Sequence, residues 1–575
     1  MNEGDSGSIR APENRTTEWG IALLCFAVSC LYLRLFYDYS ILNADEGIVL
    51  QGAQRLLQGQ VLYRDFFSFF TPGSYYWMAL LFKIFGSSIL VARAALIVYG
   101  GLFSVLTYLL ARRVSPRWSA LLACYAVTLT CLPFRFVALH NWDSTLLSYL
   151  TLYGAVRWLE IGNWKLETGN SKIESRKSKV GNVWAFATGS FAALTFLFEH
   201  SKGAGLILGL GVGLLALNIS KIEDRQSKIG PAAFCFLPSA YWLLAGAAWP
   251  LVVTFGYFAA HRALTPMLAD WAWPVFHYSG ANRLPYGYLV MSTPDRGVLW
   301  SGSWVERLAT LLILGPCILL PILPLVALGV LIWLVLKRSE DKLPARTRAY
   351  FVLVSAVLCG LLSSTFLTKR PDFTHLNYLA PLFYLVLAWV LDGLKVPSRL
   401  WLAVKPLVMF LAFLSYTAFG TMLLLGPLGA HNKLKTARGT IRTGNPDSAV
   451  EYLQTHVAPG ERIFVYPYQP LYYYLSGTFN ATRFDFLQPG MHTLDQLQET
   501  IKELEVNHPR VVLFEASFSE NIELFWPKTP LGVIAAKDPV ADYVFAHYRP
   551  CRALSASGFW QFVFMVRQGD SCPGS

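Results

Sequence analysis

Two adjacent carboxylates, Asp45 and Glu46, follow the first long apolar stretch of the chain, and Arg64 and Asp65 lie further along the same connecting segment. Carboxylates are costly to hold beside a bilayer, so ionisable groups at the mouth of a membrane protein suggest that chemistry or ion handling takes place there. We therefore predict that Asp45 and Glu46 are catalytic and that Arg64 and Asp65 bind substrate.

Further polar side chains recur at the ends of later apolar stretches. His140 and Asp143 stand between the third and the fourth stretch, Lys202 lies in the short turn between the fifth and the sixth, and Arg370 and His375 lie between the ninth and the tenth. A carboxylate can take the proton of an incoming hydroxyl, while Lys and Arg stabilise the charge on a departing phosphate. Such a set suits transfer from a phosphate-linked lipid donor, and we predict that these five residues bind substrate.

Each of these residues also has a structural explanation. Arg64 and Asp65 could form a surface ion pair, which is usually worth only about 0–1 kcal/mol. Asp143 could cap a helix, as could Asp45. Arg370 and His375 could mark the membrane edge. These alternatives stay open at the level of the sequence.

The composition defines the elements that must position these groups. The chain has 575 residues, of which 54% are hydrophobic and only 15% charged, with a mean hydropathy of +0.41. A soluble globule would expose too much apolar surface at this composition, so we predict a polytopic α-helical membrane protein. A bilayer needs about 20 apolar residues per crossing. Eleven spans are expected, at about 19–37, 88–111, 116–134, 143–159, 183–198, 203–218, 232–258, 307–336, 349–367, 376–393 and 404–427.

The distribution of Lys and Arg predicts the orientation of the chain. Every second connection is basic, beginning with Arg10 and Arg15 ahead of the first span and with Arg112, Arg113 and Arg117 after the second. Cytoplasmic loops collect such residues, so the N-terminus is expected in the cytoplasm. An odd number of spans then places the C-terminal segment, and all the polar groups above, on the extracytoplasmic side. The net charge of +12 reports topology and attraction to anionic lipid rather than nucleic-acid binding.

We divide the chain into an N-terminal tail (1–18), a transmembrane domain (19–429) with a structured first outer loop (38–87), and a C-terminal extracytoplasmic α/β domain (430–575). In the loop, apolar spacing predicts a short helix from Asp45 and a second one after Gly73. In the last domain we expect helices at 448–456, 493–506 and 538–547 and strands at 462–466, 510–515 and 559–567. Cys551 and Cys572 lie in this domain, and the sequence leaves open whether they are bridged; no cysteine spacing resembles a zinc site.

The order of these features resembles a known family. The Asp45-Glu46 pair, the Tyr63-Arg64-Asp65 segment, the Ser201-Lys202-Gly203 turn, and Arg370-Pro371-Asp372 with His375 together resemble the integral-membrane GT-C glycosyltransferases. The similarity covers about residues 19–400. Within that superfamily, the bacterial aminoarabinose-transferase-like and protein-mannosyltransferase-like enzymes are the most similar subgroup.

The resemblance implies an inverting transferase in the bacterial inner membrane, which moves a sugar from a polyprenyl-phosphate donor to a lipid, glycan or protein acceptor on the outer face. By this analogy Asp45 acts as the general base or as the acid that orients the acceptor, and Lys202 and Arg370 are among the candidates for contacting the donor phosphate. Members differ in whether they use a divalent cation, which leaves that cofactor open. The rival interpretations are a lipid or solute transporter or flippase, and a non-catalytic glycan-binding membrane protein.

Overall fold

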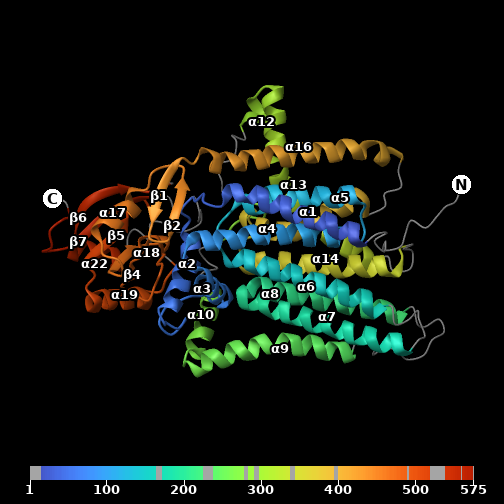
Figure 1. The fold of residues 1–575 in the computed structure, drawn as a ribbon, viewed down its shortest axis with the longest axis horizontal. Coiled ribbons are helices and arrows are strands. Elements are labelled where there is room, and N and C mark those ends of the chain that lie inside the picture. Colours follow the sequence, from blue (N-terminus) through green and yellow to red (C-terminus); the bar gives the residue numbers. More distant parts are fainter. Residues whose placement is uncertain are drawn as a thin grey trace.

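The computed structural model describes residues 15–163, 171–223, 237–277, 283–289, 297–336, 343–393, 399–488, 491–518, 538–557 and 560–573. Long helices lie side by side in one bundle, and a sheet-containing domain sits at one end of it (Figure 1). The helices of the bundle are α1 (Arg15–Leu33), α4 (Ile89–Ala111), α5 (Arg117–Phe134), α6 (His140–Asn163), α7 (Ser171–Phe198), α8 (His200–Glu223), α9 (Leu237–Ala260), α13 (Trp304–Leu336), α14 (Ala345–Leu367), α15 (Phe373–Ala388) and α16 (Arg399–Gly429).

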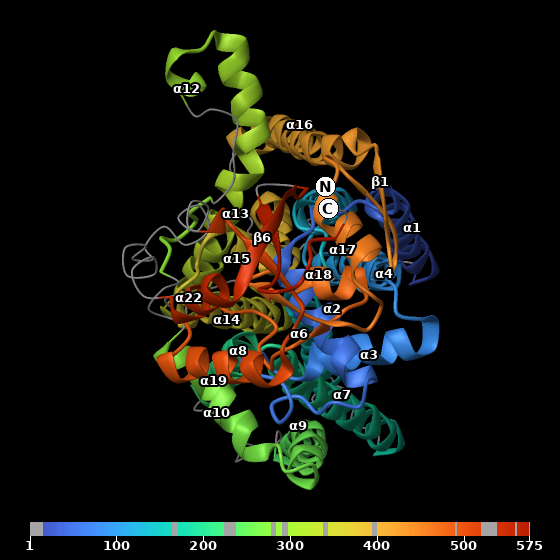
Figure 2. The same cartoon turned by 90° about the vertical axis from the view of Figure 1, so that its left-hand side faces the viewer.

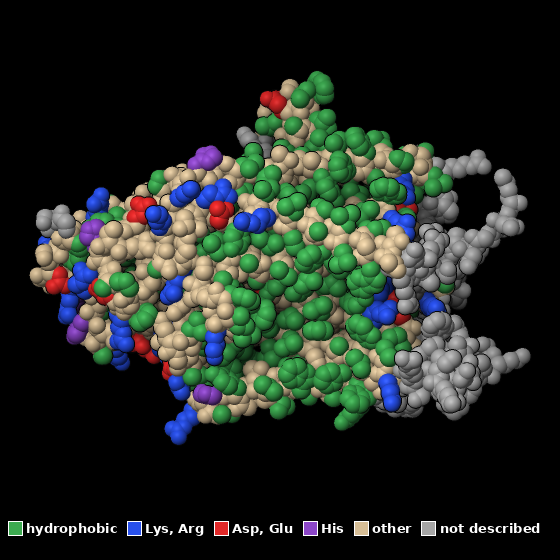
Figure 3. Space-filling model, viewed as in Figure 1, with side chains coloured by type: hydrophobic (Ala, Val, Ile, Leu, Met, Phe, Trp, Pro, Cys, Tyr) green, Lys and Arg blue, Asp and Glu red, His purple; other side chains and the backbone are tan. Residues whose placement is uncertain are grey.

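The bundle has the composition and the surface of a membrane domain. Ten helical segments of the described chain are long and apolar enough to cross a bilayer. Helix α6, which contains the predicted span 143–159, is not among the ten, although it lies within the bundle (Figure 1). Hydrophobic side chains cover the visible side of the bundle, while charged ones gather at its two ends and on the sheet domain (Figure 3). The predicted polytopic helical fold is confirmed. Residues 1–14 and 232–236, at the ends of predicted segments, lie outside the described residues.

The first loop forms two short helices against the end of the bundle, as predicted. Helix α2 (Ala44–Leu57) begins where the Asn43 side chain accepts a hydrogen bond from the Asp45 backbone N–H at 2.9 Å, which satisfies one of the free donors of a helix start. Helix α3 (Gly73–Phe85) follows Pro72, whose fixed φ suits a helix start. Two smaller helices, α10 (Leu264–Phe276) and α12 (Val298–Ser301), follow α9, and α12 and the start of α13 project away from the bundle (Figure 2).

The C-terminal domain is a mixed α/β unit. Its helices are α17 (Ser448–His456), α18 (Leu471–Ser476), α19 (Leu494–Asn507) and α22 (Pro539–His547), and its strands are β1 (Asn432–Thr436), β2 (Gly439–Thr443), β3 (Arg462–Tyr466), β4 (Phe479–Asn480), β5 (Val511–Glu515), β6 (Tyr548–Ser555) and β7 (Gln561–Arg567). The sheet order is β4-β3-β5-β7-β6, with β3 parallel to β4 and β5 and with β7 antiparallel to β5 and β6. Strands β1 and β2 form a separate hairpin. Every predicted helix and strand of this domain is present.

Two ion pairs join the first loop to this domain. Arg55 of α2 contacts Asp485 at 2.7 Å, and both side chains are 6% exposed. Arg442 of β2 contacts Asp38 through two hydrogen bonds of 2.8 and 2.7 Å. A buried pair of this kind costs several kcal/mol to break from one side, because the partner is left charged and unpaired. The sheet domain is therefore fixed against the loop.

A close backbone approach joins the same two parts. A Cβ atom added to Gly47 of α2 would lie 2.2 Å from the Leu471 backbone nitrogen, at the start of α18. Only glycine lets the two backbones come this near. Helix α18 and the turn before it consequently pack directly on α2.

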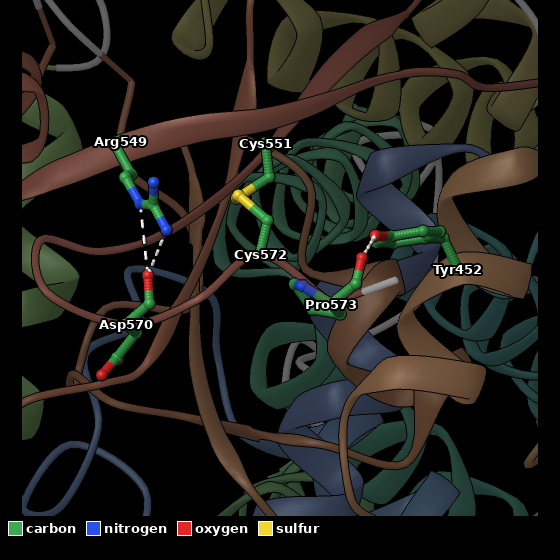
Figure 4. The surroundings of a disulfide bond; sticks show 6 residues. All are labelled: Tyr452, Arg549, Cys551, Asp570, Cys572 and Pro573. Carbon is green, nitrogen blue, oxygen red and sulfur yellow. Dashed lines mark hydrogen bonds between the residues drawn. A yellow bond between two sulfur atoms is a disulfide. The ribbon is translucent and has the colours of Figure 1, made fainter. Parts of the chain in front are cut away.

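Cys551 and Cys572 form a disulfide at the far edge of the domain (Figure 4). Near it, the Tyr452 hydroxyl donates to the Pro573 carbonyl at 3.0 Å and Arg549 donates to the Asp570 carbonyl. The bond ties the chain's last described residues to β6. It answers the question that the sequence leaves open.

Candidate active site

Asp45 lies where the bundle, the first loop and the C-terminal domain meet. Its position in the first turn of α2 is set by the Asn43 cap. One carboxylate oxygen accepts a hydrogen bond of 2.5 Å from Arg135, and the other accepts one of 2.5 Å from the Tyr468 hydroxyl. The Asp45 side chain is 36% exposed, so it remains accessible beside these two donors. Each carboxylate oxygen still has a lone pair for another partner.

Arg135 follows α5 directly and points its guanidinium at the first loop. It also approaches the Asn43 amide oxygen at 3.4 Å, and its backbone carbonyl accepts a hydrogen bond from the Trp142 indole. Its Nε is buried and has no hydrogen-bond partner among the described residues. Arg135 is not among the residues predicted from the sequence, although an arginine at the outer end of an apolar span, on the same side as Asp45, is a usable signal.

Glu46 lies in a different environment from its neighbour. Its side chain is fully buried and pairs with Arg93 of α4 at 2.7 Å, and its second oxygen accepts the Ala138 backbone N–H at 2.8 Å. Successive helical residues point about 100° apart, so adjacent carboxylates of one helix cannot share one site. These contacts hold α2 against α4 and leave the Glu46 carboxylate fully buried.

A small polar hollow, partly open to the outside, lies at the same end of the bundle. Its polar lining comes from the start of α6, the α7–α8 turn, the end of α14 and the start of α15. The lining residues are Asn141, Glu199, Lys202, Ser364, Thr365, Thr368, His375, Tyr378 and Leu379. Two residues predicted to bind substrate, Lys202 and His375, therefore border one cavity.

Lys202 of α8 is 2% exposed and its ammonium is surrounded by oxygen atoms. The partners are the Asn141 carbonyl at 2.8 Å, Ser144 Oγ at 2.9 Å, Thr145 Oγ1 at 3.0 Å and Glu199 Oε2 at 3.0 Å. Burial alone would raise the pKa of Glu199, but the Lys202 ammonium and His140 reverse this and hold it at about 2. Lys202 thus joins α8 to α6 through hydrogen bonds, a structural role that the sequence does not show.

Asp372 organises the other wall of the hollow. It is fully buried and caps α15 by accepting the His375 backbone N–H at 3.0 Å. The Arg370 Nε donates to it at 2.9 Å, and the His375 Nδ1 lies 3.1 Å from both its oxygens. Burial opposes ionisation, but His375 and Arg370 hold the pKa of Asp372 well below its usual range. Because Asp372 occupies Nδ1, the Nε2 edge of His375 is the one available to a ligand.

His140 and Asp143 differ in their surroundings. The His140 ring packs on Phe70 at 4.3 Å between centroids, and its buried Nδ1 has no partner in the described part of the chain. Asp143 instead accepts hydrogen bonds from Ser74 at 2.6 Å and Tyr99 at 2.8 Å, which tie α6 to α3 and α4. His140 is therefore open to a further partner, whereas the contacts of Asp143 are internal.

Arg64 and Asp65 form the surface ion pair that the sequence offered as an alternative. Two hydrogen bonds of 2.8 Å join them, and the side chains are 44% and 30% exposed. The Arg64 guanidinium is directed towards the His261 carbonyl, at the end of α9. Their described contacts do not include Asp45 or the residues of the hollow.

Electrostatic contacts connect Asp45 with the hollow. The charge of Asp45 acts on His140 and on Tyr378, and Tyr378 also experiences the charges of Arg135, Asp372 and Glu199. Tyr378 lines the hollow, and its ring packs edge-on at 5.0 Å on that of Trp142, whose indole donates to the Arg135 carbonyl. The arrangement offers one accessible carboxylate near a hollow lined with hydroxyl groups, His375 and the Lys202–Glu199 ion pair. Within the described ranges, no group of three or more His, Cys, Asp or Glu side chains has a metal-binding arrangement.

Comparison with known proteins gives one family and one shared fold. Residues 71–166 match the family described as dolichyl-phosphate-mannose-protein mannosyltransferase. The structure is similar to that of ArnT from Cupriavidus metallidurans bound to undecaprenyl phosphate, with 12% identity, a TM-score of 0.51, and coverage of 96% of this chain and 98% of ArnT. The archaeal oligosaccharyltransferase AglB from Archaeoglobus fulgidus, in complex with an inhibitory peptide and a dolichol-phosphate, matches with 11% identity, a TM-score of 0.49, and coverage of 98% and 76%.

A comparison with curated proteins finds no match. The family segment covers α3, α4, α5 and α6, and it includes Arg135, which contacts Asp45, and Asn141, which lines the hollow. The ArnT likeness extends over nearly the whole of both chains and includes the sheet domain. Residues 71–166 therefore match the mannosyltransferase family model, and the chain as a whole has the fold of ArnT.

Proposed function

We propose that the protein transfers a sugar from a polyprenyl-phosphate donor to a hydroxyl-bearing acceptor, with inversion at the anomeric carbon and with Asp45 as the general base. The observation that carries this proposal is an accessible carboxylate, gripped by Arg135 and placed beside a polar hollow at the membrane edge. ArnT, which shares the fold, was crystallised with undecaprenyl phosphate. A donor held in the bilayer by its lipid tail would present its phosphate at this level.

In the proposed reaction, the acceptor oxygen forms a bond to the anomeric carbon while the bond from that carbon to the phosphate oxygen breaks. The acceptor proton passes to Asp45, and the polyprenyl phosphate leaves with the bonding electron pair. The phosphate would bind at the hollow, where the His375 Nε2 is the available donor. Lys202 and Arg370 add positive charge nearby, which stabilises the leaving group even where their own hydrogen bonds are internal.

We further propose that the site faces the extracytoplasmic side of a bacterial inner membrane. Disulfides persist in oxidising compartments, and Cys551–Cys572 belongs to the domain that packs on Asp45. The basic residues Arg112, Arg113 and Arg117 follow α4 at its other end, as cytoplasmic residues do. Both observations support the same orientation.

The test is transfer of label from polyprenyl-phosphate-linked radiolabelled sugars, offered as a panel to membranes of the source organism that contain the protein. Asp45→Asn should reduce transfer by about 10²–10⁴-fold, the usual contribution of a general base. Asp495→Asn, which removes an exposed carboxylate from the first turn of α19, is the matched control and should retain full transfer. Full transfer by Asp45→Asn would eliminate Asp45 as the base, and transfer from no polyprenyl-phosphate sugar would contradict the donor class.

A further inference from the structure

We propose that the C-terminal domain supplies a positioning residue of the active site, Tyr468, whose hydroxyl orients the Asp45 carboxylate. This inference rests on the function proposed above, since it concerns the geometry of the same base. Tyr468 lies 423 positions from Asp45 in the sequence, and its hydroxyl donates to Asp45 Oδ1 at 2.5 Å. The sheet domain is thereby part of the catalytic unit and not an appended module.

Two donors from different parts of the protein fix this carboxylate. Arg135 of the bundle binds one oxygen and Tyr468 of the sheet domain binds the other. A carboxylate held at both oxygens cannot rotate about its Cβ–Cγ bond without losing a hydrogen bond to a charged group. The remaining lone pairs then keep a constant direction, which a base needs when it meets an acceptor hydroxyl.

The surroundings of Tyr468 hold its ring in place. The side chain is 9% exposed, and its ring contacts Phe486 edge-on at 5.5 Å between centroids. Tyr468 lies in the turn between β3 and α18, directly ahead of the close approach of Leu471 to Gly47. The hydroxyl is therefore delivered by a rigid segment rather than by a free loop.

Two ion pairs between the first loop and the C-terminal domain also hold Tyr468 in its position. The buried Arg55–Asp485 pair and the Arg442–Asp38 pair lie on other parts of the same interface. Neither pair touches Asp45, yet both hold the domain that carries Tyr468. These ion pairs fix the orientation of the C-terminal domain, which a flexible linker alone would not do. A fixed domain can place the Tyr468 hydroxyl accurately against Asp45.

Tyr468→Phe is the direct test, because it removes the hydroxyl and keeps the ring that packs on Phe486. We expect kcat for sugar transfer to fall about tenfold, the usual value of a hydrogen bond to a charged group, with the KM for the polyprenyl-phosphate sugar unchanged. Tyr548→Phe is the matched control: it removes a buried tyrosine hydrogen bond of 2.8 Å to the Pro509 carbonyl in the same domain, in the edge strand β6. It should leave kcat unchanged.

A double-mutant cycle separates positioning from stability. In an Asp45→Glu background, whose carboxylate no longer meets the Tyr468 hydroxyl in the same geometry, Tyr468→Phe should have almost no further effect. If the two substitutions instead reduce kcat by independent factors, or if Tyr468→Phe and Tyr548→Phe lower activity and melting temperature alike, Tyr468 is only structural and the inference is overturned. An inactive Asp45→Asn beside a fully active Tyr468→Phe would overturn this inference alone and leave the proposed base in place.

Discussion

Replacing Gly47 by alanine tests the interface between α2 and α18. We expect this substitution to destabilise the protein, whereas glycine to alanine within a helix usually stabilises it. Glycine inside a helix is normally less favourable than alanine by about 1 kcal/mol, so Gly→Ala usually stabilises. At Gly47 the new Cβ would lie 2.2, 2.6 and 2.8 Å from the N, Cα and Cβ atoms of Leu471. Two of these are backbone atoms, which cannot rotate away.

The required displacement follows from these distances. Ordinary contact begins at 3.4 Å, so α18 must retreat by about 1.2 Å. Overpacking of this kind costs about 1–3 kcal/mol. The same movement would lengthen the 2.5 Å hydrogen bond between Tyr468 and Asp45 beyond the limit of about 3.5 Å if it is directed outwards. We therefore expect Gly47→Ala to lower both the melting temperature and the rate of sugar transfer.

The measurement is thermal unfolding in detergent together with label transfer, with Gly20→Ala as the matched control. Gly20 lies in α1, and an added Cβ there meets no atom within 4 Å. Gly20→Ala should be neutral or slightly stabilising and fully active. If Gly47→Ala behaves like Gly20→Ala in both measurements, the close packing of α18 on α2 and the argument built on it are wrong.

Two other predictions concern the extramembranous parts. Replacing Cys551 and Cys572 by alanine removes a cross-link between positions 21 residues apart and should lower the free energy of unfolding by about 3 kcal/mol. The C-terminal domain should then melt at a lower temperature, and reductant should have the same effect on the wild type. Equal melting curves would contradict this. Burial raises the pKa of Asp270 in α10 to about 7. Between pH 4 and 7 the carboxyl therefore ionises in the unfolded chain but stays protonated in the folded one, so the free energy of unfolding falls as the pH rises over this range. Asp270→Asn should then melt increasingly above the wild type over that range, and a pH-independent difference would refute it.

The sequence predicts the elements of this protein better than the contacts of its site. Spans and surface helices follow from local patterns, as at α2, where Asn43 and the apolar spacing define the start and the buried face. The predicted helix 448–456 and strand 462–466 coincide with α17 and β3. Strand β6 and the β1–β2 hairpin were not predicted. The hairpin is rich in polar residues, β6 has no regular alternation of apolar residues, and both depend on partner strands for their definition.

The partners of the candidate residues could not be read from the sequence. Asp45 and Glu46 are adjacent and chemically alike, yet one is accessible and the other is fully buried beside Arg93. The oxygen cage around Lys202 and the hydrogen bond from Tyr468 join positions that are distant in the chain. No local pattern encodes such distances, since they arise only when helices and domains pack.

The most direct measurement of the central claim is a cryo-EM map of the protein with bound polyprenyl phosphate. We predict phosphate density in the hollow beside His375 and Lys202, with the phosphate oxygen that would bear the sugar facing Asp45. Density for the phosphate at the opposite end of the bundle, beside Arg112 and Arg113, would contradict it.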